Sequence, residues 1–371
     1  MVARYPEAGK GKGTRFEQGR DAVANSMQRY MDVLRAKVKS PVAIVLGAPA
    51  EAGAVVDALR LEGTVCYQMD LYSADRLKEV LKEQNLQAEV VAAADAWDVP
   101  GQFASVIYIS PVTGERSLKL DMVEQSYHLL QPGGTFYVLS PFNPDSFFAA
   151  QMKKIFGAVR ATPLDDATIF WSVRKEDRPR RRHEVTFRAR DGEQPSREFL
   201  SRPGVFSYGK MDDGTRALAD CMIIEPDERI VDLGCGCGAA GIFAGLRGGP
   251  NSRVTFVDSN VRSIAVASMN ATSNEVPAFT TLATWQPEKL PRESADVILA
   301  NPPYFGGGEI AARFIDYARI GLKPGGRLYL VTKLTGLFGE LLMNAFEEVA
   351  AESSRGYEVF SARIKQFQRR S

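Results

Sequence analysis

The chain of 371 residues is long enough for two domains of about 150 residues each. Hydrophobic residues make up 45% and charged residues 25%, a balance that supports buried cores and argues against disorder as the main state. The net charge of +1 requires no polyanionic partner, although a local basic face would suffice to bind nucleic acid.

Two further features of the composition bear on location and metal chemistry. No apolar run approaches the roughly 20 residues that cross a bilayer, and the polar, basic start has no signal-peptide core. Four cysteines in a chain of this length predict reduced thiols, and only His128 and His183 are available as histidine ligands. We therefore expect a cytoplasmic protein with no membrane partner and no metal site.

Apolar runs typical of β-strands alternate with helical stretches along the whole chain, which is the pattern of α/β domains with mostly parallel sheets. In the first half, strands are expected at 42–46, 105–109 and 135–140. In the second half, strands are expected at 229–233, 253–258, 295–300 and 327–332, with helices at 239–247, 261–273 and 309–320.

The two halves of the sequence repeat each other. The segment ASVIYISP at 104–111 aligns with ADVILANP at 295–302, and LQPGG at 130–134 aligns with LKPGG at 322–326. IVLG at 44–47 also aligns with VDLG at 231–234, so three matches occur in the same order and at nearly constant spacing. We therefore predict two tandem Rossmann-like domains, each with helices on both faces of its sheet.

The expected boundaries are 1–174 for the first copy, 175–200 for a basic linker and 201–371 for the second copy. The linker includes the run RPRRR at 178–182. Such a run suits a solvated linker, and it equally suits a basic edge that steers RNA phosphates toward the second domain. The sequence leaves both interpretations open.

The two copies have diverged at the position of a ligand-binding loop. The second copy has GCGCG at 234–238, whereas the first has GAPAE at 47–51. Pro49 removes a backbone donor and Glu51 adds negative charge, and Asn301 of the second copy corresponds to Ser110 of the first. The chemistry is therefore expected in the second copy, with the degenerate first copy serving RNA binding or structure.

The glycine loop follows a predicted strand and opens a predicted helix. Glycines at its turns allow positive φ and let the backbone approach a ligand at a helix N-terminus; they are Gly234, Gly236 and Gly238. Asp232 is placed to accept from an amino-acid ammonium, and Asp258 ends the next strand, where a carboxylate can bind ribose hydroxyls. The G-x-G-x-x-G match at 236–241 also suits a dinucleotide dehydrogenase, but Asp232 would repel a pyrophosphate.

A second motif, Asn301-Pro302-Pro303-Tyr304, follows another predicted strand at the edge where ligands bind in open α/β folds. The Asn301 side-chain oxygen and the Pro302 carbonyl can accept both hydrogens of one planar NH2 group, and Tyr304 can stack on the ring that carries it. Accepting both hydrogens favours the pyramidal, more nucleophilic amine that exists near a transition state. The motif predicts a receptor for a nucleobase amine or an amide.

Together these motifs resemble those of the class I S-adenosylmethionine-dependent amino-methyltransferases. A degenerate copy before an intact one is similar to the ribosomal-RNA guanine-N2 methyltransferases, as are SRPGVFS at 201–207 and MDDGT at 211–215. The resemblance implies that Asp232 and the loop glycines hold the methionine part of S-adenosylmethionine and that Asp258 holds its ribose. Thr284 stands where the family usually has Asp or Asn near the adenine.

The resemblance further implies methyl transfer to the N2 amine of a guanine in ribosomal RNA, with Asn301, Pro302 and Tyr304 as the catalytic residues. The expected partner is ribosomal RNA or an assembling ribosomal subunit, and an internal interface in place of a homodimer interface favours a monomer. An adenine-N6 RNA or DNA methyltransferase and a protein-glutamine N5 methyltransferase fit the same amine receptor. A non-catalytic RNA-binding factor is a further alternative.

Overall fold

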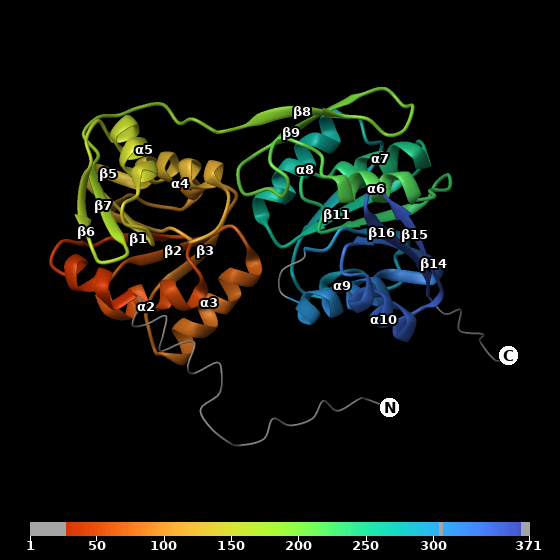
Figure 1. The fold of residues 1–371 in the computed structure, drawn as a ribbon, viewed down its shortest axis with the longest axis horizontal. Coiled ribbons are helices and arrows are strands. Elements are labelled where there is room, and N and C mark those ends of the chain that lie inside the picture. The colour runs from red at the N-terminus through yellow and green to blue at the C-terminus, as the bar shows by residue number, and fades with distance from the viewer. Residues whose placement is uncertain (1–26, 304–306, 365–371) are drawn as a thin grey trace, which may run out of the picture.

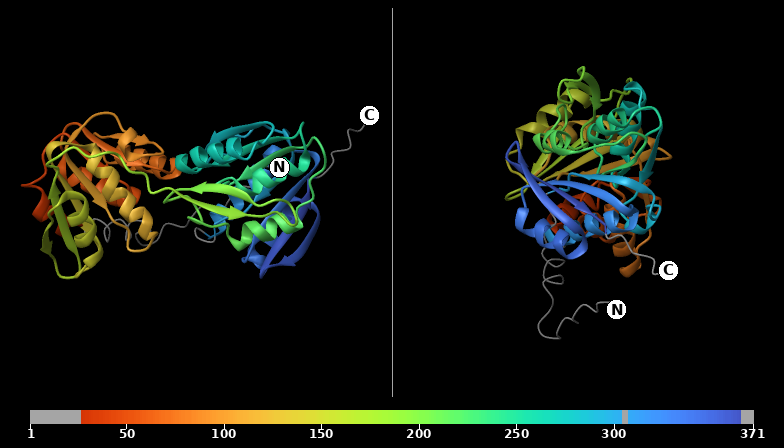
Figure 2. Two further views of the ribbon diagram at one scale, coloured as in Figure 1. Left: turned by 90° about the horizontal axis from the view of Figure 1, so that it is seen from above. Right: turned by 90° about the vertical axis from the view of Figure 1, so that its right-hand side faces the viewer.

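The computed structural model describes residues 27–303 and 307–364 of the chain. Two α/β units lie side by side along its longest axis, as Figure 1 and Figure 2 show. The first unit runs from red to yellow in Figure 1, and the second runs from green to blue.

The first unit contains a seven-stranded sheet in the order β3-β2-β1-β4-β5-β7-β6. The strands are β1 (Val42–Val45), β2 (Thr64–Gln68), β3 (Glu89–Ala92), β4 (Phe103–Ile109), β5 (Leu130–Ser140), β6 (Arg160–Pro163) and β7 (Thr168–Val173). The core on one face includes α2 (Pro49–Leu59) and α3 (Leu71–Glu83), and the core on the other includes α4 (Arg116–Leu129) and α5 (Ser146–Phe156). The central strands β1 and β4 are buried on both faces, which explains their nearly continuous apolar sequences.

The second unit repeats this topology in the order β12-β11-β10-β13-β14-β16-β15. Its strands are β10 (Arg229–Leu233), β11 (Arg253–Asp258), β12 (Phe279–Ala283), β13 (Ala295–Ala300), β14 (Leu322–Thr332), β15 (Glu347–Ser354) and β16 (Tyr357–Arg363). The core on one face includes α6 (Asp213–Cys221), α7 (Ala239–Gly248) and α8 (Val261–Ser273), and the core on the other includes α9 (Gly307–Gly321) and α10 (Thr335–Ala345). The prediction of two tandem Rossmann-like units is confirmed.

The repeated L-x-P-G-G motif forms the same structure in both units. It begins β5 in one and β14 in the other, and Gly133 and Gly325 both have φ of 79°. The pairing with the neighbouring strand shifts register at this point in both sheets. Left-handed backbone of this kind favours glycine, so the motif repeats for a structural reason.

The expected linker divides between the two units. Its first part lies on the first copy, where the guanidinium groups of Arg180 and Arg182 lie 5.5 and 5.7 Å from the ring centre of Trp97. Its second part forms a two-stranded sheet of β8 (Val185–Ala189) and β9 (Arg197–Ser201). The hairpin packs on the second copy, because Asn270 of α8 bonds to both the N–H and the carbonyl of Leu200.

The two copies meet through a local two-fold arrangement. The N–H of Leu71 donates to the carbonyl of Ser259, and the N–H of Val261 donates to the carbonyl of Met69, both at 2.9 Å. The two donors lie 190 positions apart in the sequence, as do the two acceptors. The starts of α3 and α8 therefore contact each other as equivalent parts of a homodimer would.

Arg262 extends this contact into the first copy. Its side chain is fully buried, and Nη1 donates to Asp121 at 2.7 Å and to the carbonyl of Pro203 at 2.6 Å. Nη2 lies 3.4 Å from Asp95. The buried guanidinium is therefore hydrogen-bonded to carboxylates of the other copy instead of to water.

The equivalent residue of the first copy, Tyr72, enters the second copy with different chemistry. Its ring lies edge-on to Trp285 at 5.1 Å between centres, and the guanidinium of Arg313 lies 5.1 Å from its centre. The indole N–H of Trp285 donates to Asp75 at 2.9 Å. An ionic contact on one side of the local axis is thus matched by an aromatic and cation–π contact on the other.

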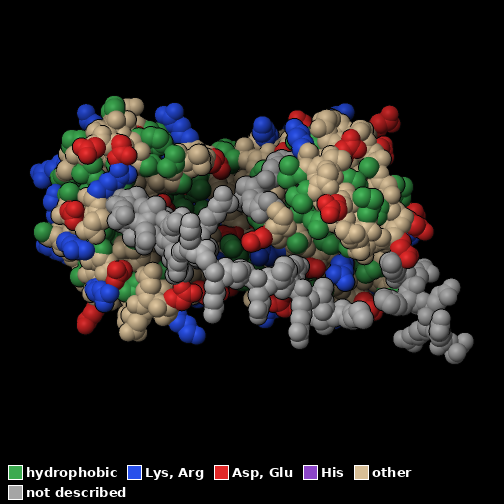
Figure 3. Space-filling view, turned by 60° about the horizontal axis from the view of Figure 1, so that its bottom comes forward, with side chains coloured by type: hydrophobic (Ala, Val, Ile, Leu, Met, Phe, Trp, Pro, Cys, Tyr) green, Lys and Arg blue, Asp and Glu red, His purple; other side chains and the backbone are tan. Residues whose placement is uncertain are grey.

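The face shown in Figure 3 carries interspersed basic and acidic side chains, in keeping with the small net charge. Within the described residues, none of the helices has the length and apolar character needed to cross a membrane.

Candidate active site

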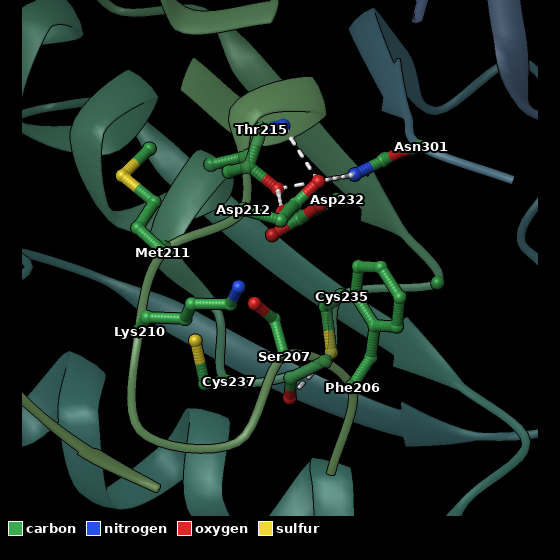
Figure 4. Close-up of a pocket in the computed structure, with 14 residues that line it drawn as sticks. Phe206, Ser207, Lys210, Met211, Asp212, Thr215, Asp232, Cys235, Cys237 and Asn301 are labelled. Carbon is green, nitrogen blue, oxygen red and sulfur yellow. Dashed lines mark hydrogen bonds between the residues drawn. The ribbon is translucent and has the colours of Figure 1, made fainter. Parts of the chain in front are cut away.

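A cavity lies at the carboxyl ends of β10 and β13 in the second copy, and Figure 4 shows the side chains around it. Its lining comes from the glycine loop, the start of α7, the end of β13 and the segment before α6. The residues are Phe206, Ser207, Lys210, Met211, Asp212, Thr215, Asp232, Gly234, Cys235, Gly236, Cys237, Ala239, Ala240 and Asn301. The structure therefore brings together four predicted site residues, namely Asp232, Gly234, Gly236 and Asn301.

The glycine loop turns as its sequence predicts, with φ of 69° at Gly234, 55° at Gly236 and 85° at Gly238. The three N–H groups, however, donate to protein acceptors. Gly234 bonds to a carbonyl of β11 at 2.8 Å, Gly236 to the carboxylate of Asp258 at 3.0 Å, and Gly238 to a carbonyl within the loop at 2.8 Å. The glycines thus let the backbone border the cavity closely, while their N–H groups hold the loop together.

Asp232 is held by the first turn of α7. The Asp232 Oδ2 accepts the N–H of Gly241 at 2.8 Å, and Asp232 is only 4% exposed to solvent. A Cβ on Gly241 would lie 2.8 Å from the Asp232 Cβ, so this close approach requires glycine. Burial raises the pKa of Asp232 to about 7 in spite of the hydrogen bond from Gly241.

Asp258 does not line the cavity itself but supports the loop beside it. One oxygen accepts the N–H of Gly236, and the other accepts the N–H of Asn260 at 2.8 Å. Burial raises the pKa of Asp258 to about 6, although both hydrogen bonds favour the ionised form. Asp232, which is buried, and Asp258, which is half-buried, are therefore two carboxylates that a bound cation would stabilise.

Asn301 directly follows β13 and lies beside the glycine loop. Its Nδ2 lies 3.1 Å from the Oδ2 of Asp212 and 3.1 Å from the hydroxyl of Thr215. Figure 4 shows the nitrogen directed toward these two side chains. Asp212 also caps α6 by accepting the N–H of Thr215 at 3.2 Å.

The remaining predicted residues that the structure describes do not line the cavity, and one further predicted residue lies outside the described chain. Thr284 is buried at the end of β12, where its N–H donates to the carbonyl of Asp258 at 2.9 Å and its own carbonyl accepts the hydroxyl of Tyr317. Pro302 is buried, and Tyr304 lies outside the described residues. Gly238 caps α7 without lining the cavity.

Six cavity residues from the segment that leads into α6 received no role from the sequence: Phe206, Ser207, Lys210, Met211, Asp212 and Thr215. Phe206 is 61% exposed and places an aromatic ring at the cavity. All but Lys210 fall in the two segments, 201–207 and 211–215, whose family resemblance was already visible. The resemblance was therefore the signal, but it did not say which side chains face the cavity.

The corresponding loop of the first copy makes contacts of its own. Glu51 accepts the N–H of Ala48 at 2.9 Å and so occupies the start of α2, where an anionic group would otherwise bind. A Cβ on Gly47 would lie 2.8 Å from the side chain of Ile109, so this loop packs closely on the end of β4. The divergence seen in the sequence thus corresponds to different contacts at this loop.

Cys235 and Cys237 are buried free thiols. Burial raises the pKa of Cys237 to about 12. In the parts of the chain that the structure describes, no group of three or more His, Cys, Asp or Glu residues is arranged to hold a metal ion.

Comparison with known sequences shows what the second copy resembles. Residues 196–361 match the family model for the methyltransferase small domain. The chain is 34% identical over 173 residues to a ribosomal RNA small subunit methyltransferase C from Chromohalobacter salexigens, covering 44% of this chain and 50% of that protein. It is 33% identical over 178 residues to a ribosomal RNA large subunit methyltransferase G from Pseudomonas syringae, covering 43% and 45%. The chain thus spans about half the length of these curated relatives.

Comparison with solved structures extends over both copies. A Thermus thermophilus 16S rRNA N2-guanine methyltransferase (RsmC), solved in complex with AdoMet and guanosine, superposes with a TM-score of 0.69 at 21% identity. The superposition covers 90% of this chain and 91% of that protein, so it shows that the tandem fold is shared. Residues 196–361 of this chain are therefore similar to the methyltransferase small domain, and they lie in the second of two tandem units that share the fold of this solved methyltransferase.

Proposed function

We propose that this protein transfers a methyl group from S-adenosylmethionine to the exocyclic N2 amine of a guanine in ribosomal RNA. One observation carries the proposal: Asn301 and Asp232, from two adjacent strands, line the same cavity beside a glycine loop. The choice of substrate follows from the comparisons. The relatives are ribosomal RNA methyltransferases, and the solved structure is that of an N2-guanine methyltransferase in complex with guanosine. This reaction would place the protein in the cytoplasm with the assembling ribosome.

The acidic character of the cavity fits the proposed cofactor. A carboxylate whose pKa is raised to about 7 by burial is costly to ionise alone, and the ammonium of the methionine part would offset that cost at Asp232. Asp258, at the end of β11, would bind the ribose hydroxyls, and Thr284 beside it would lie near the adenine. Gly234 and Gly236 would leave room for the methionine part, and Gly238 would support the loop as the cap of α7.

S-adenosylmethionine supplies an electrophilic methyl group on a sulfonium, so the protein has to present the amine in line with it. The Asn301 Oδ1 and the Pro302 carbonyl would accept the two amine hydrogens, and Tyr304 would stack on the base. These contacts strengthen as the nitrogen becomes pyramidal and gains positive charge, which lowers the barrier rather than only binding the base. The displaced proton leaves to solvent after transfer.

The test uses isotopically labelled S-adenosylmethionine, the purified protein and separated small- and large-subunit RNA from a strain lacking the gene. Label recovered by mass spectrometry in N2-methylguanosine supports the proposal and identifies the subunit. Label in N6-methyladenosine alone contradicts it, as does label in protein glutamine alone when ribosomal protein is added as a second acceptor. As a control for the site, Asn301→Ala should lower turnover about 10²-fold or more, while the Kd for the cofactor stays nearly unchanged.

We also propose a structural role for the first copy, with the domain boundaries at 1–174, 175–200 and 201–371. The first copy supplies carboxylate partners of Arg262 and a hydrogen-bond acceptor that holds the start of α8. Because equivalent surfaces of the two copies already cover each other, the protein is proposed to act as a monomer. Sedimentation at micromolar concentration should give the mass of one chain, and a stable dimer would contradict this.

A further inference from the structure

The orientation of the Asn301 amide follows from the chemistry of its neighbours. An ionised carboxylate only accepts hydrogen bonds, so the Asp212 oxygen at 3.1 Å requires the NH2 end of Asn301 to face it. The hydroxyl of Thr215 donates to the other oxygen of Asp212, and its lone pair is left to accept from Asn301 at 3.1 Å. Both neighbours thus select the same end of the amide.

The consequence concerns the other end of the amide. With its NH2 group engaged by Asp212 and Thr215, Asn301 has its Oδ1 left as an acceptor. A carboxylate bonded to the amide nitrogen also polarises the amide and increases the negative charge on Oδ1, because hydrogen bonds in a chain strengthen one another. Both effects favour a neighbouring amine that becomes positively charged as it reacts.

The surrounding backbone is built to hold this arrangement. Asp212 is the N-cap of α6 and is held by the N–H of Thr215, so its carboxylate has little freedom. A Cβ on Gly214 would lie 2.9 Å from the Asp212 oxygen and 3.3 Å from the Asn301 nitrogen. The absence of a side chain at 214 therefore lets the two groups meet, although they are 89 positions apart in the sequence.

We infer that Asp212, together with Thr215, is a positioning residue for methyl transfer, which holds Asn301 with its oxygen toward the target amine. The inference rests on the proposed role of Asn301 as the amine receptor. Asp212 acts through Asn301, so its loss should lower kcat and leave cofactor binding intact.

The first test is Asp212→Asn, a nearly isosteric change. Asparagine remains a good N-cap, so α6 should keep its stability. Its amide offers a donor as well as an acceptor, and Asn301 can then turn its oxygen away from the amine. We expect kcat to fall roughly 10- to 100-fold, with an unchanged Kd for S-adenosylmethionine and an unchanged Tm. Thr215→Val should act in the same direction, and Thr215→Ser, which keeps the hydroxyl, should retain activity.

A reciprocal exchange tests the pairing itself. Asn301→Asp places two carboxylates in contact and should lower activity below that of Asp212→Asn. Adding Asp212→Asn to Asn301→Asp restores a donor opposite an acceptor, so the double variant should be more active than Asn301→Asp alone. Full kcat in Asp212→Asn, or a double variant no better than Asn301→Asp, would overturn the inference.

These outcomes are separable from failure of the proposed function. The assay uses whichever amine the wild-type protein methylates, so an active wild type with an insensitive Asp212→Asn counts only against the positioning role. A measurement on the protein without substrate tests the hydrogen bond between Asp212 and Asn301 directly. The side-chain NH2 hydrogens of Asn301 should exchange slowly in the NMR spectrum of the wild type and faster in Asp212→Asn; equal exchange rates would refute the inference even if no methylated product were found.

Discussion

Replacing Asp232 with asparagine should stabilise the protein without ligand at alkaline pH. Burial raises the pKa of Asp232 to about 7, whereas the carboxyl of an unfolded chain titrates near 3.8. The folded state therefore binds this proton more tightly than the unfolded state does. The stability of the wild type is unaffected below about pH 4 and falls as the pH rises to about 7, where the buried carboxyl ionises.

The magnitude follows from the same values. The interval between 3.8 and about 7 corresponds to at most roughly 4 kcal/mol at 1.36 kcal/mol per pKa unit. The asparagine oxygen can still accept the N–H of Gly241, so the variant keeps that contact while removing the charge. We expect Asp232→Asn to exceed the wild type in free energy of unfolding at pH 8 by up to this amount, and the difference to shrink toward pH 5.

The assay is denaturant unfolding of both proteins at pH 5, 6, 7 and 8, with and without S-adenosylmethionine. Asp296→Asn is the matched control. Burial alone would raise the pKa of Asp296, but its hydrogen bond with Lys323 holds the pKa below the ordinary value, so its removal should destabilise the protein at pH 8. The cofactor should stabilise the wild type at pH 8 much more than Asp232→Asn. If Asp232→Asn without ligand is less stable than the wild type at pH 8, the reasoning fails.

Two further variants probe the cofactor site and the contact between the copies. Asp258→Ala removes the acceptor of the Gly236 N–H and the proposed ribose ligand, so the Kd for S-adenosylmethionine measured by calorimetry should rise at least about 10-fold; an unchanged Kd would remove Asp258 from the site. Arg262→Ala leaves Asp121 buried without its cation and should cost about 3–5 kcal/mol in the free energy of unfolding, whereas an unchanged transition would show that this contact contributes nothing.

Much of the backbone could be predicted from sequence because the signals are local. The central strands β10, β11 and β13 are largely apolar runs at their predicted bounds, since a parallel sheet covered on both faces buries most of its side chains. The glycine loop was visible for a similar reason, because left-handed turns favour one residue type. The duplication was visible in the sequence because both copies use the L-x-P-G-G motif to begin the equivalent strands β5 and β14.

Other elements gave weaker local signals. The hairpin β8–β9 lies in a polar segment that resembles a linker, and its stability comes from packing against α8 of the second copy. The outer strands β12 and β15 are largely exposed, so they lack the apolar runs that mark the central strands.

The sequence by itself determined the fold class, the duplication, the glycine loop and the motif that begins at Asn301. Only the tertiary structure decided that Asp212 bonds to Asn301 and that Arg262 bonds to Asp121, across 89 and 141 positions of the chain. A strand or a tight turn restricts its own residues and so leaves a pattern in the sequence. A polar side chain reads as a surface residue until folding brings its distant partner within hydrogen-bonding distance and excludes water from both.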